Sequence, residues 1–176
     1  MSLLAMSIAA AADGHNPFTG FYGGAESGLE SMTFNGANEK YISYAFFGGY
    51  RYQMNSGLVA GVEVYYGEND YNSWGGFDES DLSVGHTKGA MAVLGYALGS
   101  EQKSLLFGKL GYSRTDFDVT GWDSGVTTSD SESGLLFGGG YEYKLWEFMS
   151  FRVAVDRVNT GMIKQTRVTI GGMLTF

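Results

Sequence analysis

The chain has 176 residues, enough for one domain, and a formal net charge of −8, which disfavours a nucleic-acid partner because nucleic acid selects a basic face. It contains no cysteine, so no disulfide, thiolate metal site or cysteine nucleophile can form. Charged residues make up 17% and aromatic residues 15%, with 28 Gly and one Pro, a mixture that suits β-strands and disfavours a disordered chain.

Residues 1–12 are expected to be a leader that precedes the folded domain. The stretch LLAMSIAAAA at residues 3–12 combines an apolar core with small residues, which is typical of a secretory signal and its cleavage site. No basic residue precedes Lys40, so the usual positive start of such a signal is absent. We expect the folded domain to span residues 13–176, and we expect no transmembrane helix because no run of about 18 apolar residues occurs.

The rest of the chain alternates between apolar and polar residues in segments separated by turn residues, which is the pattern of half-buried strands. Connections at residues 54–57, 99–103 and around Trp146 are short, whereas residues 71–83 and 118–132 are longer and rich in Ser, Gly, Asp and Thr. Short turns at one end and long loops at the other are typical of transmembrane barrels. The strands of this all-β chain are predicted at residues 18–30, 41–53, 58–70, 84–98, 104–117, 133–145, 149–159 and 164–176.

Each predicted strand has an apolar face and a face that carries charge. In the last strand Val168, Ile170 and Phe176 share one face and Arg167 lies on the other. Periodicity leaves open which face is inside, because a soluble barrel or sandwich would turn its charged face to water. The interior of an eight-stranded barrel is only just wide enough for side chains, so charges there must pair. The charges expected inside a membrane barrel are Glu26, Glu63, Glu142, Asp156, Arg51, Lys109, Arg152 and Arg167.

A weak internal repeat places one tyrosine before each short turn. The segments GGYRYQ, LGYALG and GGYEYK contain Tyr50, Tyr96 and Tyr141 at nearly equal spacing. Tyrosine suits a membrane interface because its ring is apolar and its hydroxyl group favours water. The repeat therefore predicts an aromatic girdle near the short turns.

The C-terminal residues carry a resemblance that decides which face is inside. The strand TRVTIGGMLTF ends in Phe176 and resembles the C-terminal strand of bacterial outer-membrane proteins. The segment GGGYEYKLWEFMSFRVAVDRV at residues 138–158 resembles the opacity-protein and OmpA/OmpX-type barrel superfamily. This resemblance implies a closed eight-stranded antiparallel transmembrane β-barrel in the lipid of the bacterial outer membrane. It further implies that the long loops lie at the cell surface and that the assembly machinery recognises Phe176.

Some small barrels modify lipid A, and a deacylase of that kind pairs a lipid-facing His with a Ser two residues later. The histidines of this chain are His15 and His86, which Pro17 and Lys88 follow at that spacing. We therefore expect no enzyme, no catalytic residue, no cofactor and no metal site.

Four basic residues form a candidate rim. Lys88, Arg114, Arg157 and Lys164 are expected to point outward near the loop ends of their strands. Lipopolysaccharide carries phosphates at that level, and Lys and Arg bind phosphate well, so these residues are candidate lipopolysaccharide contacts. The alternative is that they only extend to the headgroups without a specific contact.

The long loops are the other candidate surface. Trp74 and Trp122 stand within them and are candidate contacts for a surface or host ligand. The acidic loop residues have oxygen ligands for divalent cations, but no EF-hand spacing occurs, and solvated loops are the simpler interpretation.

Three functions stay open, and the sequence favours the first. It is a structural or surface-interaction role, adhesin-like, for a barrel with a plugged polar interior. The second is a narrow channel for small solutes, which inward glycines such as Gly49 and Gly111 favour and inward ion pairs oppose. The third is a lipid A-modifying enzyme.

Overall fold

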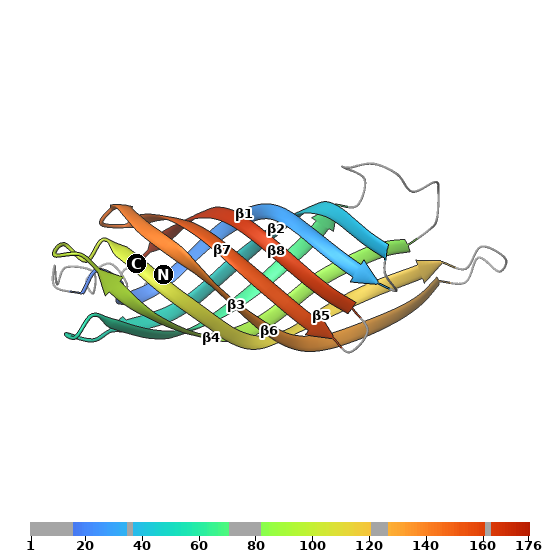
Figure 1. Cartoon of the computed structure of the whole chain (residues 1–176), viewed down its shortest axis with the longest axis horizontal. Coiled ribbons are helices and arrows are strands. Elements are labelled where there is room, and N and C mark those ends of the chain that lie inside the picture. The colour runs from blue at the N-terminus through green and yellow to red at the C-terminus, as the bar shows by residue number, and fades with distance from the viewer. Residues whose placement is uncertain (1–15, 35–36, 71–81, 121–126, 161–162) are drawn as a thin grey trace, which may run out of the picture.

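The computed structural model describes residues 16–34, 37–70, 82–120, 127–160 and 163–176. Eight antiparallel strands follow one another around a closed barrel, and the last pairs with the first (Figure 1). This confirms the predicted fold class. No helix in the described ranges is long and apolar enough to cross a membrane. The strands are β1 (Gly20–Phe34), β2 (Ala37–Gln53), β3 (Leu58–Asp70), β4 (Leu82–Leu98), β5 (Ser104–Thr120), β6 (Thr127–Trp146), β7 (Met149–Thr160) and β8 (Ile163–Thr175).

The two ends of the barrel differ. Residues 54–57, 99–103 and 147–148 connect strands at one end, where the chain also finishes (Figure 1). This end is termed the turn end. The opposite end, where β1, β3, β5 and β7 finish, is termed the loop end.

The register fixes the tilt of the strands. A row of paired residues that leaves β1 at Tyr22 passes once around the barrel and returns to β1 at Met32, ten residues further along. With strands about 4.8 Å apart and about 3.3 Å per residue, this offset gives eight strands a tilt of about 40°. Side chains fill a barrel of this size.

The predicted loop at residues 118–132 is wrong over most of its length. β5 and β6 stay paired from Asp118 with Ser129 to Thr120 with Thr127, so only residues 121–126 lie between them. β2 likewise begins at Ala37 rather than at residue 41. Apolar alternation marks only the part of a strand that faces lipid, whereas backbone hydrogen bonds continue where the side chains are polar.

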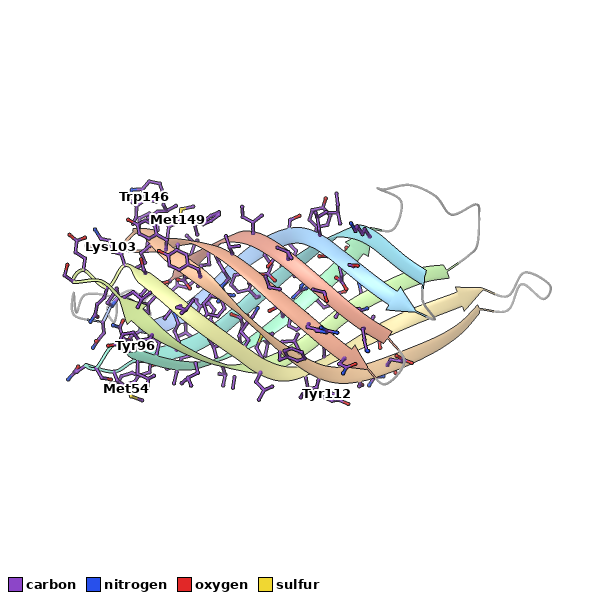
Figure 2. All side chains as sticks on the ribbon, viewed as in Figure 1. Met54, Tyr96, Lys103, Tyr112, Trp146 and Met149 are labelled. Carbon is purple, nitrogen blue, oxygen red and sulfur yellow. The ribbon has the colours of Figure 1, made fainter. Side chains whose placement is uncertain are left out.

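An apolar belt surrounds the barrel. Phe46 is 68% exposed and Val62 63% exposed, although both are large and apolar. The predicted girdle residues Tyr50, Tyr96 and Tyr141 are also exposed, and Tyr96 lies near the turn end while Tyr112 lies further toward the loop end (Figure 2). A continuous exposed apolar surface of this kind marks contact with lipid. The apolar face of each strand is therefore the outer face.

Inside the barrel, large rings lie over glycines of neighbouring strands. A Cβ atom added to Gly49 would lie 2.8 Å from the Tyr22 ring, and one added to Gly24 would lie 2.7 Å from the Phe47 ring. At Gly111 an added Cβ would lie 2.5 Å from the Cβ of Met91. The glycines that could have left room for a channel are thus covered by neighbouring side chains. The directly paired rings and glycines are Tyr22–Gly49, Phe47–Gly24, Tyr65–Gly89 and Phe107–Gly140.

Candidate functional site

Two Arg–Glu pairs cross the half of the lumen next to the turn end. Arg51 donates its two Nη groups to the two oxygens of Glu142 at 2.6 and 2.8 Å. Arg152 donates to Glu63 Oε2 at 2.8 Å, and the Tyr22 hydroxyl donates to the same oxygen at 2.9 Å. The four charged side chains are at most 2% exposed. They are termed the turn-side tier.

Aromatic rings cover the guanidinium groups of this tier. Arg152 lies 4.4 Å from the centre of the Phe47 ring and 4.8 Å from that of Phe107. Arg51 lies 4.7 Å from the centre of the Tyr22 ring. A cation over a ring gains about 0.5–2 kcal/mol, most where water is excluded. The rings thus stabilise the charges and occupy the space beside them.

Residues 16–19 fold across the mouth of the barrel at the turn end. Phe18 is fully buried, its N–H donates to Gln53 Oε1 at 3.1 Å, and the ring lies 5.0 Å beneath the Arg51 guanidinium. The N–H of Gln53 donates to Thr19 Oγ1 at 3.0 Å. The predicted strand start at residue 18 is therefore wrong, because Phe18 turns inward before β1 begins at Gly20.

A second group of charges lies nearer the loop end and is termed the loop-side tier. Lys109 donates to Asp156 Oδ2 at 2.9 Å, and Arg167 donates to the same oxygen at 3.2 Å. Arg167 also lies 3.4 Å from Glu26 Oε1. The eight interior charges named from the sequence thus form two ion-paired groups.

Two further charged residues, Glu30 and Lys144, are buried but were not among the interior charges predicted from the sequence. Both follow the same alternation, since Glu30 stands four residues after Glu26 and Lys144 two residues after Glu142. Lys144 donates to the carbonyl oxygen of Glu147 at 2.7 Å. The alternation of inward and outward residues along each strand was therefore sufficient to place both side chains inside the barrel.

A small cavity accompanies the loop-side tier. Its volume is about 10 Å³, which is room for about one water molecule. Glu26 Oε2 and Asp156 Oδ1 have no hydrogen-bond partner among the described residues. The cavity is lined by Glu30, Tyr65, Gly67, Thr87, Asp156, Val158, Gln165 and Arg167.

The four basic rim residues are exposed on the outer surface, but their surroundings differ. Lys88 and Arg114 face each other across β4 and β5, and both contact Asp116, at 3.1 and 3.2 Å. Arg157 and Lys164 lie on β7 and β8, and neither forms an ion pair with a residue in the described ranges. The structure therefore divides the rim into two pairs.

The remaining predicted residues lie apart from these groups. His86 stacks on Tyr66 with ring centres 5.2 Å apart and lies 3.5 Å from Glu68 on the outer surface.

Phe176 donates its N–H to the carbonyl oxygen of Phe21 at 2.8 Å, and its side chain is exposed. Trp74, Trp122 and the leader at residues 1–12 lie outside the described residues. Within the described part of the chain, no group of three or more His, Cys, Asp or Glu side chains could hold a metal ion.

Comparisons with known proteins agree with this architecture. The family model described as the outer membrane protein beta-barrel domain matches residues 1–176. Neisserial surface protein A is similar in structure, with 17% identity, a TM-score of 0.68 and coverage of 90% of this chain and 98% of that one. The attachment invasion locus protein Ail of Yersinia pestis has 17% identity and a TM-score of 0.59 over 90% and 99% of the two chains. OprG of Pseudomonas aeruginosa has 15% identity and a TM-score of 0.54 over 93% and 98%. No curated protein sequence matches the chain.

Proposed function

The chain belongs to the outer-membrane protein β-barrel family and is a closed barrel of the bacterial outer membrane, and from that premise we propose that it has a structural or surface-interaction role. The turn-side tier is the observation that carries this proposal. Its Arg–Glu pairs are at most 2% exposed, rings cover both guanidinium groups, and Phe18 lies across the mouth. These contacts support a plugged polar interior.

Opening a continuous pore through this tier would be costly. Separating a buried ion pair leaves charges without partners in a medium of low dielectric constant, at a cost of about 3–5 kcal/mol for each pair broken. Two such pairs and the Phe18 ring would have to move together. A narrow channel is therefore the weaker alternative.

Conductance across a planar lipid bilayer tests the proposal. We expect the purified wild-type barrel to insert without steady current, and we expect Phe18→Ala to raise the frequency of brief openings without producing a stable channel. A steady ohmic current through the wild-type protein would contradict the plugged interior and favour the channel.

Enzymatic modification of lipid A finds little support in the described residues. A His–Ser pair is missing at the spacing of the deacylases, since Lys88 stands two residues after His86. His86 instead contacts Tyr66 and Glu68 on the outer surface. Release of fatty acid from lipopolysaccharide by the purified barrel would overturn this interpretation.

The surface role rests on the loops. Trp74 and Trp122 belong to segments that hold acidic residues and connect strands at the loop end. We assign them as contacts for a surface or host ligand. If Trp74→Ala combined with Trp122→Ala leaves the binding of intact bacteria to host cells and matrix proteins unchanged, that assignment fails.

Phe176 is proposed as the residue that the assembly machinery recognises. Its exposed ring closes the outer face of β8, and its N–H bonds to β1 at the seam of the barrel. Phe176→Ala should lower the amount of protein assembled in the outer membrane in cells. The same variant should refold in detergent as well as wild type, because its contribution is to recognition rather than to packing.

A further inference from the structure

We propose that phosphate groups of lipopolysaccharide bind to the outer face of β7 and β8 and its continuation across β1 to Lys40 on β2. Lys88 and Arg114 of the predicted rim do not take part. This inference rests on the proposed function, because it requires a barrel whose outer face lies against the outer leaflet. The residues of this phosphate-binding face are Arg157, Lys164, Lys40, Thr166 and Ser31.

The register aligns four of these residues in one row across four strands. Arg157 on β7 pairs with Thr166 on β8, Thr166 pairs with Ser31 on β1, and Ser31 pairs with Lys40 on β2. Strands lie about 4.8 Å apart, so the basic ends of the row are about 14 Å from each other. Lys164 stands two residues from Thr166 on the same face of β8. Two hydroxyl groups thus lie between basic side chains, and all can bond to phosphate oxygens.

The height of this face fits the headgroup layer. With strands tilted by about 40°, Arg157 lies within about 3 Å of the level of Tyr44, Tyr66 and Tyr112, at the edge of the apolar belt. On the same geometry, Lys40 and Lys164 lie about 8–10 Å nearer the loop end. The three basic groups therefore span the layer in which the phosphates of a glycolipid lie, which favours a lipid over a soluble anion.

No carboxylate lies on the β7–β8 part of this face. From Arg157 to Phe176 the sequence contains no Asp or Glu, although the whole chain carries a net charge of −8. Residues 68–81 and 116–132 each contain five acidic residues and no basic residue. Charge on the outer part of the chain is thus distributed unequally, and β7 with β8 is the side to which an anionic lipid is attracted.

The β4–β5 pair differs because it already has an anion. Asp116 contacts both Lys88 Nζ and Arg114 Nε. Arg114 also donates to Ser131 Oγ at 2.9 Å. A phosphate would have to displace the carboxylate of Asp116, whereas at Arg157 no described residue competes. Arginine favours phosphate in particular because its planar guanidinium group bonds to two oxygens at once.

Two charge-removing variants test the proposal. One combines Lys40→Gln, Arg157→Gln and Lys164→Gln, and the matched control combines Lys88→Gln with Arg114→Gln. Each full-length barrel is refolded in detergent, mixed with lipopolysaccharide or with its enzymatically dephosphorylated form, and examined by native mass spectrometry for bound glycolipid. We expect the triple variant to lose affinity by about tenfold or more, since each basic group at a membrane surface contributes to anionic-lipid binding. The control should stay within about twofold of wild type, since Asp116 already pairs with both of its basic groups.

The outcomes separate failure of this inference from failure of the proposed function. All proteins are also run on a gel with and without boiling, because a closed barrel resists SDS and migrates faster unboiled. If the triple variant binds lipopolysaccharide as wild type does while both variants keep the faster band, the inference is overturned and the closed barrel stands. Equal loss in both variants, or equal binding of dephosphorylated lipopolysaccharide by wild type, also overturns it. Absence of the faster band in wild type would contradict the proposed function itself.

Discussion

The two halves of the lumen hold the same kinds of charged residue but pack them differently. In the turn-side tier each guanidinium has its own carboxylate, at 2.6–2.8 Å, and lies against aromatic rings. In the loop-side tier Lys109 and Arg167 share Asp156, the Arg167–Glu26 contact is 3.4 Å, and a cavity lies alongside. Similar ion pairs can therefore form a ring-covered group at one depth and a group beside a cavity at another.

Breaking a turn-side pair should have the largest effect. Glu142→Ala leaves the buried Arg51 guanidinium without its carboxylate, which should lower the free energy of unfolding by about 3–5 kcal/mol. The measurement is a urea titration of the barrel in lipid vesicles, in which the intensity of the faster band of unboiled samples on a gel gives the folded fraction.

A matched double variant sharpens this test. Arg51→Met combined with Glu142→Leu removes both charges and should cost much less than Glu142→Ala, because an apolar pair can replace a buried ion pair with little net change. If the double variant is as unstable as the single one, the shape of the pair rather than its charge holds the tier together.

Removing the ring at the mouth should have a smaller effect. Phe18→Ala takes away a fully buried side chain, and we expect a loss of at most about 3 kcal/mol, the low end for Phe→Ala, because residues 16–19 can detach without unpairing a strand. The same urea titration measures this loss in the free energy of unfolding. A loss as large as that of Glu142→Ala would mean that the segment is part of the cooperative fold.

A loop-side substitution should cost less again. In Lys109→Met, Asp156 keeps Arg167 as a partner at 3.2 Å, so this carboxylate is not left without a cation. We expect about 1–2 kcal/mol, the cost of one lost hydrogen bond at a carboxylate that water reaches through the cavity. A loss equal to that of the turn-side variant would remove the distinction between the tiers.

An ion pair exposed to water should contribute least to the stability of the barrel. The hydrogen bond from Lys103 at 2.6 Å lowers the pKa of Glu101. A carboxyl group whose pKa is lowered in the folded state stabilises the protein at pH values above its unfolded-state pKa. That stabilisation is lost as the pH falls through the folded-state pKa. Because both side chains are largely in water, we expect no difference between Glu101→Gln and wild type in urea midpoints from neutral pH to about pH 4.

Much of the fold could be predicted because one physical rule governs every strand. In a barrel that spans lipid, alternate residues face hydrocarbon, so the period of two holds along the paired strands apart from irregularities at residues 84–87 and 144–146. Which face is inside could not be decided by periodicity, since a soluble barrel has the same period. The resemblance of the C-terminal strand decided it, and the exposed apolar belt confirms it.

The contacts that could not be predicted depend on distances between residues of different segments, and the alternation along one strand gives no such distances. Phe18 lies outside the alternating pattern, and its contact with Arg51 depends on how residues 16–19 turn across the end of β2. Asp116 could not be identified as the partner of both Lys88 and Arg114, because that depends on the register between β4 and β5. The sequence therefore predicted which residues face inward and outward, and the structure added which of them meet.

The most direct test of the packed turn-side half uses introduced thiols, because the chain has no cysteine of its own. Thr87→Cys lines the loop-side cavity, and Ser150→Cys lies on the turn-end side of Arg152 on β7, at 0% exposure. In vesicles treated with a small, membrane-impermeant thiol reagent on both sides, we expect rapid labelling at position 87 and no labelling at position 150. Labelling of position 150 as fast as position 87 would contradict the account, because water and solutes would then reach the depth at which we propose that the lumen is closed.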